Sequence, residues 1–459
     1  MRKKWEYNLY SFYDRTGIEA HLEAMAAKGW LLEKIDRVFW RYRRTEPRTV
    51  HISVVYFAPA SEFDCGPGEA QQTFQDYCRE TGWTQLAGWS QMLVFYSEAP
   101  QPVPIETDAA AQVDAVHAAM KKNFLITNVL MAILALIQAL RGIRDLVTSF
   151  TDTLADPASL SALTLWLLLS VFSLTEIITY FLWRRKALAA AQQEGRFTST
   201  RGHRGFQTVL LIISGVMLVW LVLSVSRPIA LVTLGAVAWV WLLEGALSLL
   251  RRAMRRTGWS TEVNRIATQV LSFLLALAFV GGMYYVIFRL FRERPWQQTY
   301  TWQGETYDLH PADLPLTVEQ LTGQPHDHVS REILCTRTPF LARLSGQETV
   351  GLPDGQERLS YTVTDILHPW LRQAVTRDLL ENVDLHFYFH SSFTVSRSWQ
   401  PEPEQDWGAD AAYRLRYDEN DELVDEYLLF YGGRIVDVQL PFTPDSAQRA
   451  CIAQALFTV

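Results

Sequence analysis

The sequence contains few cysteines and none of the short motifs that mark common catalytic sites. Its 459 residues include four cysteines, and their spacing matches no metal-binding pattern. It has no His-Glu-x-x-His zinc motif, no nucleophile elbow, no phosphate loop and no paired catalytic carboxylates. We therefore expect a protein that is not an enzyme, with no catalytic residue, no cofactor and no metal site.

The chain also lacks a surplus of basic charge and an early apolar segment. Its net charge of −7 gives no reason to expect direct nucleic acid binding. Residues 1–20 have no apolar core of the kind found in cleavable signal peptides. Basic residues concentrate between later apolar runs, where anionic lipid headgroups attract them. The expected partners are the lipid bilayer and other membrane or regulatory proteins.

Long apolar runs occupy the middle of the chain. A helix needs about 20 mostly apolar residues to span a bilayer. Buried helices of a soluble core normally carry a polar stripe, which these runs lack. The sequence therefore predicts a multi-pass protein of the cell membrane, with a five-span block at residues 123–290. The five runs cover residues 124–140, 160–183, 209–225, 229–250 and 266–288.

Lysine and arginine near the runs predict the orientation, because cytoplasmic loops carry an excess of these residues. Lys121 and Lys122 precede the first run, and two larger basic groups follow the second and fourth runs. This bias places the N-terminus in the cytoplasm, and five spans then place the C-terminal part outside. Arg289, Arg292 and Arg294 follow the last run and argue against this, but the two larger groups outweigh them.

Residues 1–98 predict a cytoplasmic α+β domain made of two similar halves. Each half combines an amphipathic helix, a Gly-Trp corner and a pair of strands. Asp14 caps the first helix near Gly17, and the second helix covers residues 69–80. We expect a ferredoxin-like sandwich, with both helices on one face of a single antiparallel sheet. The predicted extended segments are 30–35, 38–44, 49–57 and 91–97.

The tryptophans of the two corners are candidate binding residues. Trp30 follows Gly29, and Trp83 follows Gly82. We favour matched core anchors where helix meets sheet over a pair that binds a ligand.

The opening of the chain resembles a known family. The residues that carry the resemblance are Tyr13-Asp14, Gly17-Ile18-Glu19, Leu22, Ala26-Ala27-Lys28-Gly29-Trp30-Leu31 and Gly82-Trp83. They are similar to the domain of unknown function 2812, which occurs in multi-pass membrane proteins of Gram-positive bacteria. The resemblance covers about the first hundred residues and implies no activity or catalytic residue. It implies a PadR-type regulator as a possible genetic neighbour only.

A linker at residues 99–122 joins this domain to the first span. Pro100, Pro102 and Pro104 form a short extended connector. The alanine-rich segment 108–122 predicts a helix that leads directly into the membrane. Such a helix would pass motion between domain and membrane, and a flexible tether is the alternative.

Two acidic residues lie inside the predicted spans. Glu176 precedes Arg184 by eight residues, and Glu244 precedes Arg251 by seven, so the two acids have similar depth and the hairpins look duplicated. Carboxylates within a bilayer are costly and tend to face the bundle interior or a water-filled cavity. They form a candidate intramembrane site for a proton or cation relay. Hydrogen bonding between helices, for example with Thr179, is the alternative.

Residues 295–459 predict an extracytoplasmic antiparallel sheet with a C-terminal helix packed on it. The predicted strands are 413–417, 426–431 and 434–440, and the helix covers 447–456. Cys335 and Cys451 would be able to pair outside the cell. Several histidines could supply metal ligands, although no spacing matches a zinc motif. These are His326, His328, His368, His386 and His390.

These observations favour a non-catalytic role in sensing, signalling or scaffolding, because two folded domains are joined across the bilayer. A proton- or ion-coupled transporter that uses Glu176 and Glu244 is the alternative. An extracytoplasmic metalloenzyme comes third.

Overall fold

The chain divides into two compact units. The first contains Met1–Ala139, Leu165–Met217 and Leu234–Tyr284, and the second contains Leu140–Thr164, Leu218–Thr233 and Tyr285–Val459. The computed structural model describes residues 2–8, 10–36, 39–60, 64, 66–200, 204–224, 227–293, 298–302, 305–309, 314–325, 329–352, 355–381, 385–389 and 391–457.

The N-terminal domain contains two three-stranded sheets with the same topology. Their orders are β1-β3-β2 and β4-β6-β5, and all neighbouring strands are antiparallel. In each half a strand is followed by a helix and a hairpin, and the last strand lies in the middle. The elements are β1 (Lys3–Tyr7), α1 (Arg15–Ala27), β2 (Trp30–Lys34), β3 (Phe39–Arg44), β4 (His51–Tyr56), α2 (Glu69–Glu80), β5 (Thr84–Trp89) and β6 (Met92–Ser97).

The two halves also share their irregular features. Gly29 and Gly82 follow the two helices with φ of 79° and 88°, the left-handed conformation that ends many helices. Each following hairpin contains a register shift, between Leu32 and Lys34 in one half and between Gln85 and Ala87 in the other. The predicted similarity of the two halves is therefore confirmed down to the position of the irregularity.

The sequence predicted a single ferredoxin-like sheet, but the strands are hydrogen-bonded into two separate sheets. The edge strand β4 is covered by α1: Glu23 accepts from the backbone N–H of Ile52 at 3.0 Å, and Glu19 accepts from that of Val54 at 2.8 Å. Carboxylates thus satisfy an edge that would otherwise pair with another strand. This side-chain cap ends the second sheet at β4.

The two corner glycines give a matched test of the fold. Replacing either with alanine puts a Cβ in the left-handed region, at a cost of about 1–2 kcal/mol. At Gly29 the new Cβ would also lie 2.7 Å from the backbone oxygen of Thr45, whereas at Gly82 no atom of the described residues lies within 4 Å. We expect Gly29→Ala to lower the unfolding midpoint of the domain more than Gly82→Ala. Limited proteolysis of the detergent-solubilised chain during heating measures both, and equal midpoints would contradict the packing at Gly29.

Among the described residues, five helices are long and apolar enough to cross a membrane. Each contains all or nearly all of one of the five apolar runs, so the described residues of these runs are helical. The apolar segments are Ile126–Thr148, Pro157–Gln193, Gly205–Ser224, Ala230–Arg255 and Thr261–Arg289. They belong to α4 (Ile126–Thr148), α6 (Pro157–Glu194), α7 (Arg204–Ser224), α8 (Arg227–Arg255) and α9 (Thr261–Glu293).

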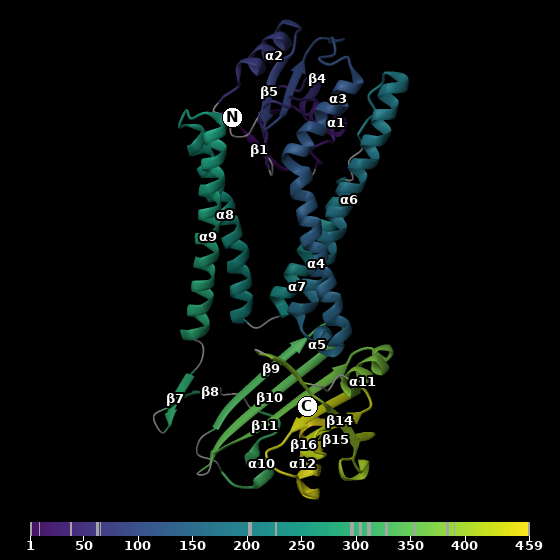
Figure 1. Cartoon of the computed structure of the whole chain (residues 1–459), viewed down its shortest axis with the longest axis vertical. Helices are drawn as coiled ribbons and strands as arrows, with labels where there is room; N and C mark the ends of the chain where they lie inside the picture. Colours follow the sequence, from purple (N-terminus) through teal and green to yellow (C-terminus); the bar gives the residue numbers. More distant parts are fainter. Residues whose placement is uncertain are drawn as a thin grey trace. The chain divides into compact units, whose positions relative to one another are not determined.

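The predicted lead-in helix is present. Asp108 caps α3 (Ala109–Met120) through the N–H groups of Ala110 and Ala111. A π-helical turn, η1 (Lys121–Leu125), joins α3 to α4 without a break (Figure 1). Such turns insert one residue into the helical path and frequently occur at functional sites.

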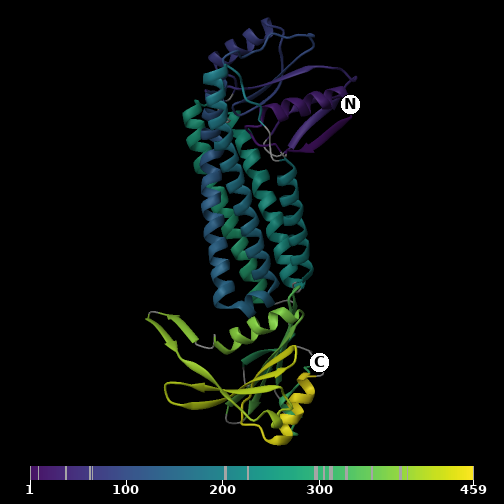
Figure 2. The ribbon, with the colours of Figure 1, turned by 90° about the vertical axis from the view of Figure 1, so that its right-hand side faces the viewer.

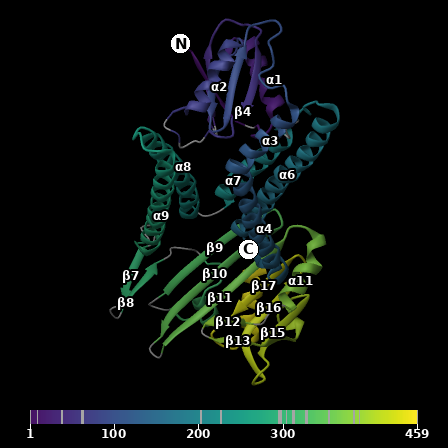
Figure 3. The ribbon, with the colours of Figure 1, turned by 45° about the horizontal axis from the view of Figure 1, so that its top comes forward.

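The second unit contains a seven-stranded antiparallel sheet in the order β14-β15-β16-β17-β11-β10-β9 (Figure 3). Its strands are β9 (Val329–Arg337), β10 (Leu341–Leu352), β11 (Gly355–Ile366), β14 (Arg397–Pro401), β15 (Ala411–Tyr417), β16 (Glu422–Tyr431) and β17 (Arg434–Gln439). Two small hairpins pair β7 (Gln298–Trp302) with β8 (Glu305–Leu309), and β12 (Leu385–Phe389) with β13 (Ser391–Val395).

Helices cover both faces of this sheet. Successive side chains of a strand point to opposite faces, so neighbouring residues of β17 contact different helices. Val436 and Val438 pack in one cluster with Ile452 of α12 (Ser446–Phe457), and α10 (Val318–Thr322) joins the same face. Ile435 packs with Val375 of α11 (Arg372–Glu381), beside α5 (Phe150–Ala155). Figure 2 shows α12, in yellow, on the opposite side of the sheet from α11. Short 3₁₀ turns, η2 (Pro369–Leu371) and η3 (Glu404–Asp406), complete the unit.

Candidate functional site

The junction between the N-terminal domain and the apolar helices is built around the loop that joins β1 to α1. Ser11, Phe12, Tyr13 and Asp14 in this loop are all buried. The Asp14 carboxylate accepts from the N–H of Gly17 at 3.1 Å and so fixes the loop to the start of α1. Residues 11–14 are therefore buried and joined to the start of α1.

A polar cluster connects this loop to two of the helices. The hydroxyl of Ser11 lies 3.0 Å from both carboxylate oxygens of Glu176 on α6. The amide of Gln207 on α7 donates to Glu176 Oε1 and lies 3.2 Å from Ser11 Oγ. Ser11 and Gln207 are buried, so both need an acceptor. One carboxylate thus holds together the domain, α6 and α7.

A second contact extends the junction along α6. Tyr13 OH lies 3.2 Å from Thr179 Oγ1, and its ring meets that of Tyr180 edge-on at 5.3 Å. Burial raises the pKa of Tyr13 to about 12; the Thr179 hydrogen bond lowers it in part, and the negative charge of Glu176 adds to the rise. Tyr13 is therefore neutral at physiological pH and remains a hydrogen-bond donor.

The lead-in helix joins the same network. His117 Nδ1 on α3 lies 2.6 Å from Tyr180 OH. Burial lowers the pKa of His117, and the positive charges of Arg184 and Lys121 lower it further. A neutral imidazole has one acceptor nitrogen, so Nδ1 can accept a hydrogen bond from the Tyr180 hydroxyl. The network therefore links the loop before α1 with α6 and α3.

Aromatic rings hold the π-turn against the domain. Phe124 of η1 stacks on Phe12 at 4.5 Å and meets Trp89 of β5 at 5.8 Å. Lys122 of the same turn donates to the backbone oxygen of Ala60 at 3.0 Å. The point where α3 becomes α4 is thus clamped by residues from both halves of the domain.

A cavity of about 540 Å³ opens beside the Ser11–Glu176–Gln207 cluster. Much of its wall is apolar and includes Phe172 of α6 and Leu210 of α7. Its shape and lining suit an amphipathic ligand, with an apolar body and a hydrogen-bonding head directed at Glu176.

The structure gives the two predicted acids different surroundings. Glu176 belongs to the junction cluster, whereas the Glu244 side chain is 62 % exposed and lies 3.7 Å from Arg251. Their similar depth in the sequence therefore does not correspond to similar contacts, and nothing among the described contacts joins the two acids into one relay.

The predicted tryptophans also differ. Trp83 is buried among residues of the second half, and its indole N–H donates to the backbone oxygen of Val103 at 2.8 Å. Trp30 is half-buried and lies under the guanidinium of Arg44 at 5.0 Å. The two rings lie in different hydrophobic clusters and form no pair.

In the second unit, the histidines proposed as metal ligands are only partly described. His326, His328 and His390 lie outside the described residues, as does the side chain of His386. His368 lies 3.0 Å from the backbone oxygen of Pro339. The part of the chain that is described contains no group of three potential metal ligands. Cys335 and Cys451 both have free thiols, so the disulfide considered from the sequence is not formed.

The sequence identified Glu176 but not its partners. Ser11 is 165 residues away and lies within an aromatic segment, and Gln207 lies just before the third apolar run. A glutamine next to an apolar run could have indicated a polar contact, because polar side chains within apolar helices need partners. Ser11 carried no such signal.

Comparison with known proteins supports the resemblance found at the start of the chain. Residues 14–129 match the model of the family described as "Protein of unknown function (DUF2812)". The match begins at Asp14 and extends through α3 and η1 into α4. No curated protein and no solved structure matches this chain.

Proposed function

We propose that this chain, whose residues 14–129 belong to the DUF2812 family, is an integral membrane protein that couples the state of its spanning helices to its N-terminal domain. The role is non-catalytic and lies in sensing, signalling or scaffolding. The N-terminal domain is cytoplasmic and the C-terminal domain extracytoplasmic.

The observation that carries this proposal is the hydrogen bonding of Glu176 to Ser11 and Gln207. An isolated carboxylate in a span is costly, so its position between a soluble domain and two helices indicates a structural connection. A shift of α6 against α7 would change these hydrogen bonds and reach the domain directly. The cavity beside the cluster supplies a place where an amphipathic ligand would bias that shift.

Relay of protons or ions through Glu176 and Glu244 is the alternative function. It needs both acids to face one path, and the exposed position of Glu244 beside Arg251 favours the coupling role instead. We further propose other membrane or regulatory proteins as partners of the N-terminal domain. A PadR-type regulator enters only as a possible genetic neighbour.

Topology mapping tests the transmembrane arrangement. Reporters that are active on one side of the membrane are fused after Gln101, Arg196, Arg256 and the last residue. We expect cytoplasmic signals at the first three sites and an external signal at the fourth, because five spans separate the ends. An internal signal at the fourth site would contradict a role that joins the two sides of the membrane.

A further inference from the structure

A second cavity in the first unit lies between the N-terminal domain and the end of α8. It has a volume of about 650 Å³ and shares no lining residue with the cavity at the junction. This volume lies within the range of small-molecule sites, which is about 300–1,000 Å³. Its lining is largely polar, unlike that of the junction cavity.

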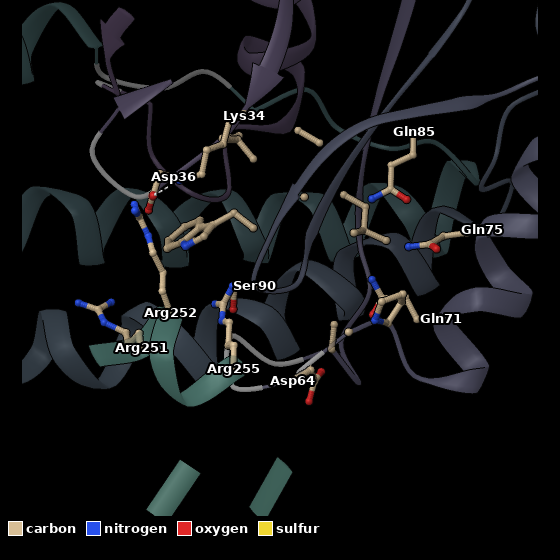
Figure 4. Close-up of a pocket in the computed structure, with 18 of the residues that line it drawn as sticks. Lys34, Asp36, Asp64, Gln71, Gln75, Gln85, Ser90, Arg251, Arg252 and Arg255 are labelled. Carbon is tan, nitrogen blue, oxygen red and sulfur yellow. Dashed lines mark hydrogen bonds and ion pairs between the residues drawn. The ribbon is translucent and has the colours of Figure 1, made fainter. Parts of the chain in front are cut away.

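Three arginines from the last turns of α8 form one wall. They are Arg251, Arg252 and Arg255, and Figure 4 shows them together on one side of the cavity. Arginine presents several N–H donors in a fixed plane that matches phosphate oxygens, and it keeps its charge at any physiological pH. Basic residues at a helix C-terminus also interact favourably with the helix dipole. That interaction does not require the side chains to face a cavity.

The opposite wall is neutral and rich in hydrogen-bonding groups. Gln71 and Gln75 lie one turn apart on α2, and Gln85 lies on β5 (Figure 4). Trp89 adds an aromatic surface. A cavity with guanidinium groups on one side and carboxamides on the other suits a ligand that has an anionic end and an uncharged polar end.

The carboxylates of the lining are held by neighbours. The contacts are Glu33 with Arg41 at 2.9 Å, Asp36 with Lys34 at 3.1 Å, and Asp64 with Thr261 at 2.9 Å. Arg251 also lies 3.7 Å from Glu244, so the arginine wall, Arg252 and Arg255 above all, is the main positive charge of the lining.

We propose that this cavity binds a phosphate-bearing polar ligand, with its phosphate on Arg251, Arg252 and Arg255 and its uncharged part against the glutamines of α2 and β5. The phosphate belongs either to an anionic lipid headgroup or to a soluble phosphorylated compound. Because α8 is a candidate span that ends at these arginines, a headgroup would reach them from the membrane surface.

Protection of a single cysteine tests the site. Gln75→Cys is introduced into the full-length chain after its four native cysteines are changed to serine, and the protein is placed in phosphatidylcholine nanodiscs. The rate at which a maleimide reacts with the introduced cysteine is measured under three conditions. These are without any probe, with inorganic pyrophosphate, and in nanodiscs that contain phosphatidylglycerol. We expect at least one probe to slow the reaction several-fold.

The two probes distinguish the sources of the phosphate. Protection by pyrophosphate identifies a soluble compound, and protection by phosphatidylglycerol alone identifies a headgroup. The double variant R252Q/R255Q should raise the amount of probe needed for half-maximal protection at least tenfold. The control R256Q/R265Q removes the same charge from neighbouring positions that do not line the cavity, and it should preserve protection. The proposal is wrong if neither probe protects the cysteine, or if the control weakens protection as much as the test variant.

Discussion

Replacing Glu176 with alanine is expected to loosen the N-terminal domain from the apolar helices. The change leaves the buried Ser11 hydroxyl and Gln207 amide without their shared acceptor. A buried group that loses its partner costs about 1–3 kcal/mol. Since each 1.4 kcal/mol is a factor of about ten, amide hydrogen exchange across residues 10–20 should become roughly tenfold to a hundredfold faster.

Glu244 provides the matched control for this prediction. It is the other predicted intramembrane acid, but it is exposed and has Arg251 as its ionic partner. Glu244→Ala should leave exchange in residues 10–20 unchanged, and Glu176→Gln, which keeps an acceptor oxygen, should give a smaller effect than alanine. Equal exchange in the two alanine variants would remove the special role of Glu176. Mass spectrometry of the exchanged full-length chain in detergent gives these rates.

Asp437→Asn is expected to stabilise the C-terminal domain at pH 8 and to have little effect near pH 4. Burial, together with the negative charge of Glu426, raises the pKa of Asp437 to about 7. Arg397 and Arg343 oppose this rise, but each also has a carboxylate of its own, Glu426 at 3.9 Å and Asp152 at 2.7 Å. The folded domain therefore holds a proton on Asp437 that the unfolded chain releases at lower pH.

The sign follows from this difference in proton binding. Between about pH 4 and pH 7 the folded state binds more protons than the unfolded state, so stability falls as the pH rises. Above pH 7 the folded state bears the full cost of an ionised, buried Asp437, about 2–4 kcal/mol. Asparagine carries no charge and removes this cost. Unfolding midpoints by proteolysis at pH 4 and pH 8 measure the change. Asp421→Asn, at an exposed turn, serves as the control, and a gain that is equal at both pH values would contradict the assignment.

Local features of the sequence predicted local structure well. The cap at Asp14, the glycines at 29 and 82 and the bounds of α2 all depend on residues close in sequence, and the structure confirms them. The five apolar runs were equally clear, because hydrocarbon length sets their size. The strand Lys3–Tyr7 was missed because most of its residues are charged or exposed and show no buried face.

The sheet arrangement and the candidate site depended on contacts that sequence patterns do not contain. Glu19 and Glu23 cap the edge of β4, and the strands form two sheets that the pattern had combined. Glu176 and Glu244 lie at similar distances from the arginines that follow them, yet this spacing does not determine which face of a helix meets a partner. The partner of Glu176, Ser11, comes from a loop before the first helix.

The most direct test of the coupling is a cross-link between the domain and the segment after α6. Thr16 Oγ1 at the start of α1 lies 2.9 Å from Thr200 Oγ1, which places cysteines at both positions within bonding reach. In membrane vesicles, T16C/T200C in a chain without native cysteines should form a disulfide rapidly. Glu176→Ala should slow it several-fold, and Glu244→Ala should not. A missing cross-link, or one that is indifferent to Glu176, would contradict the account.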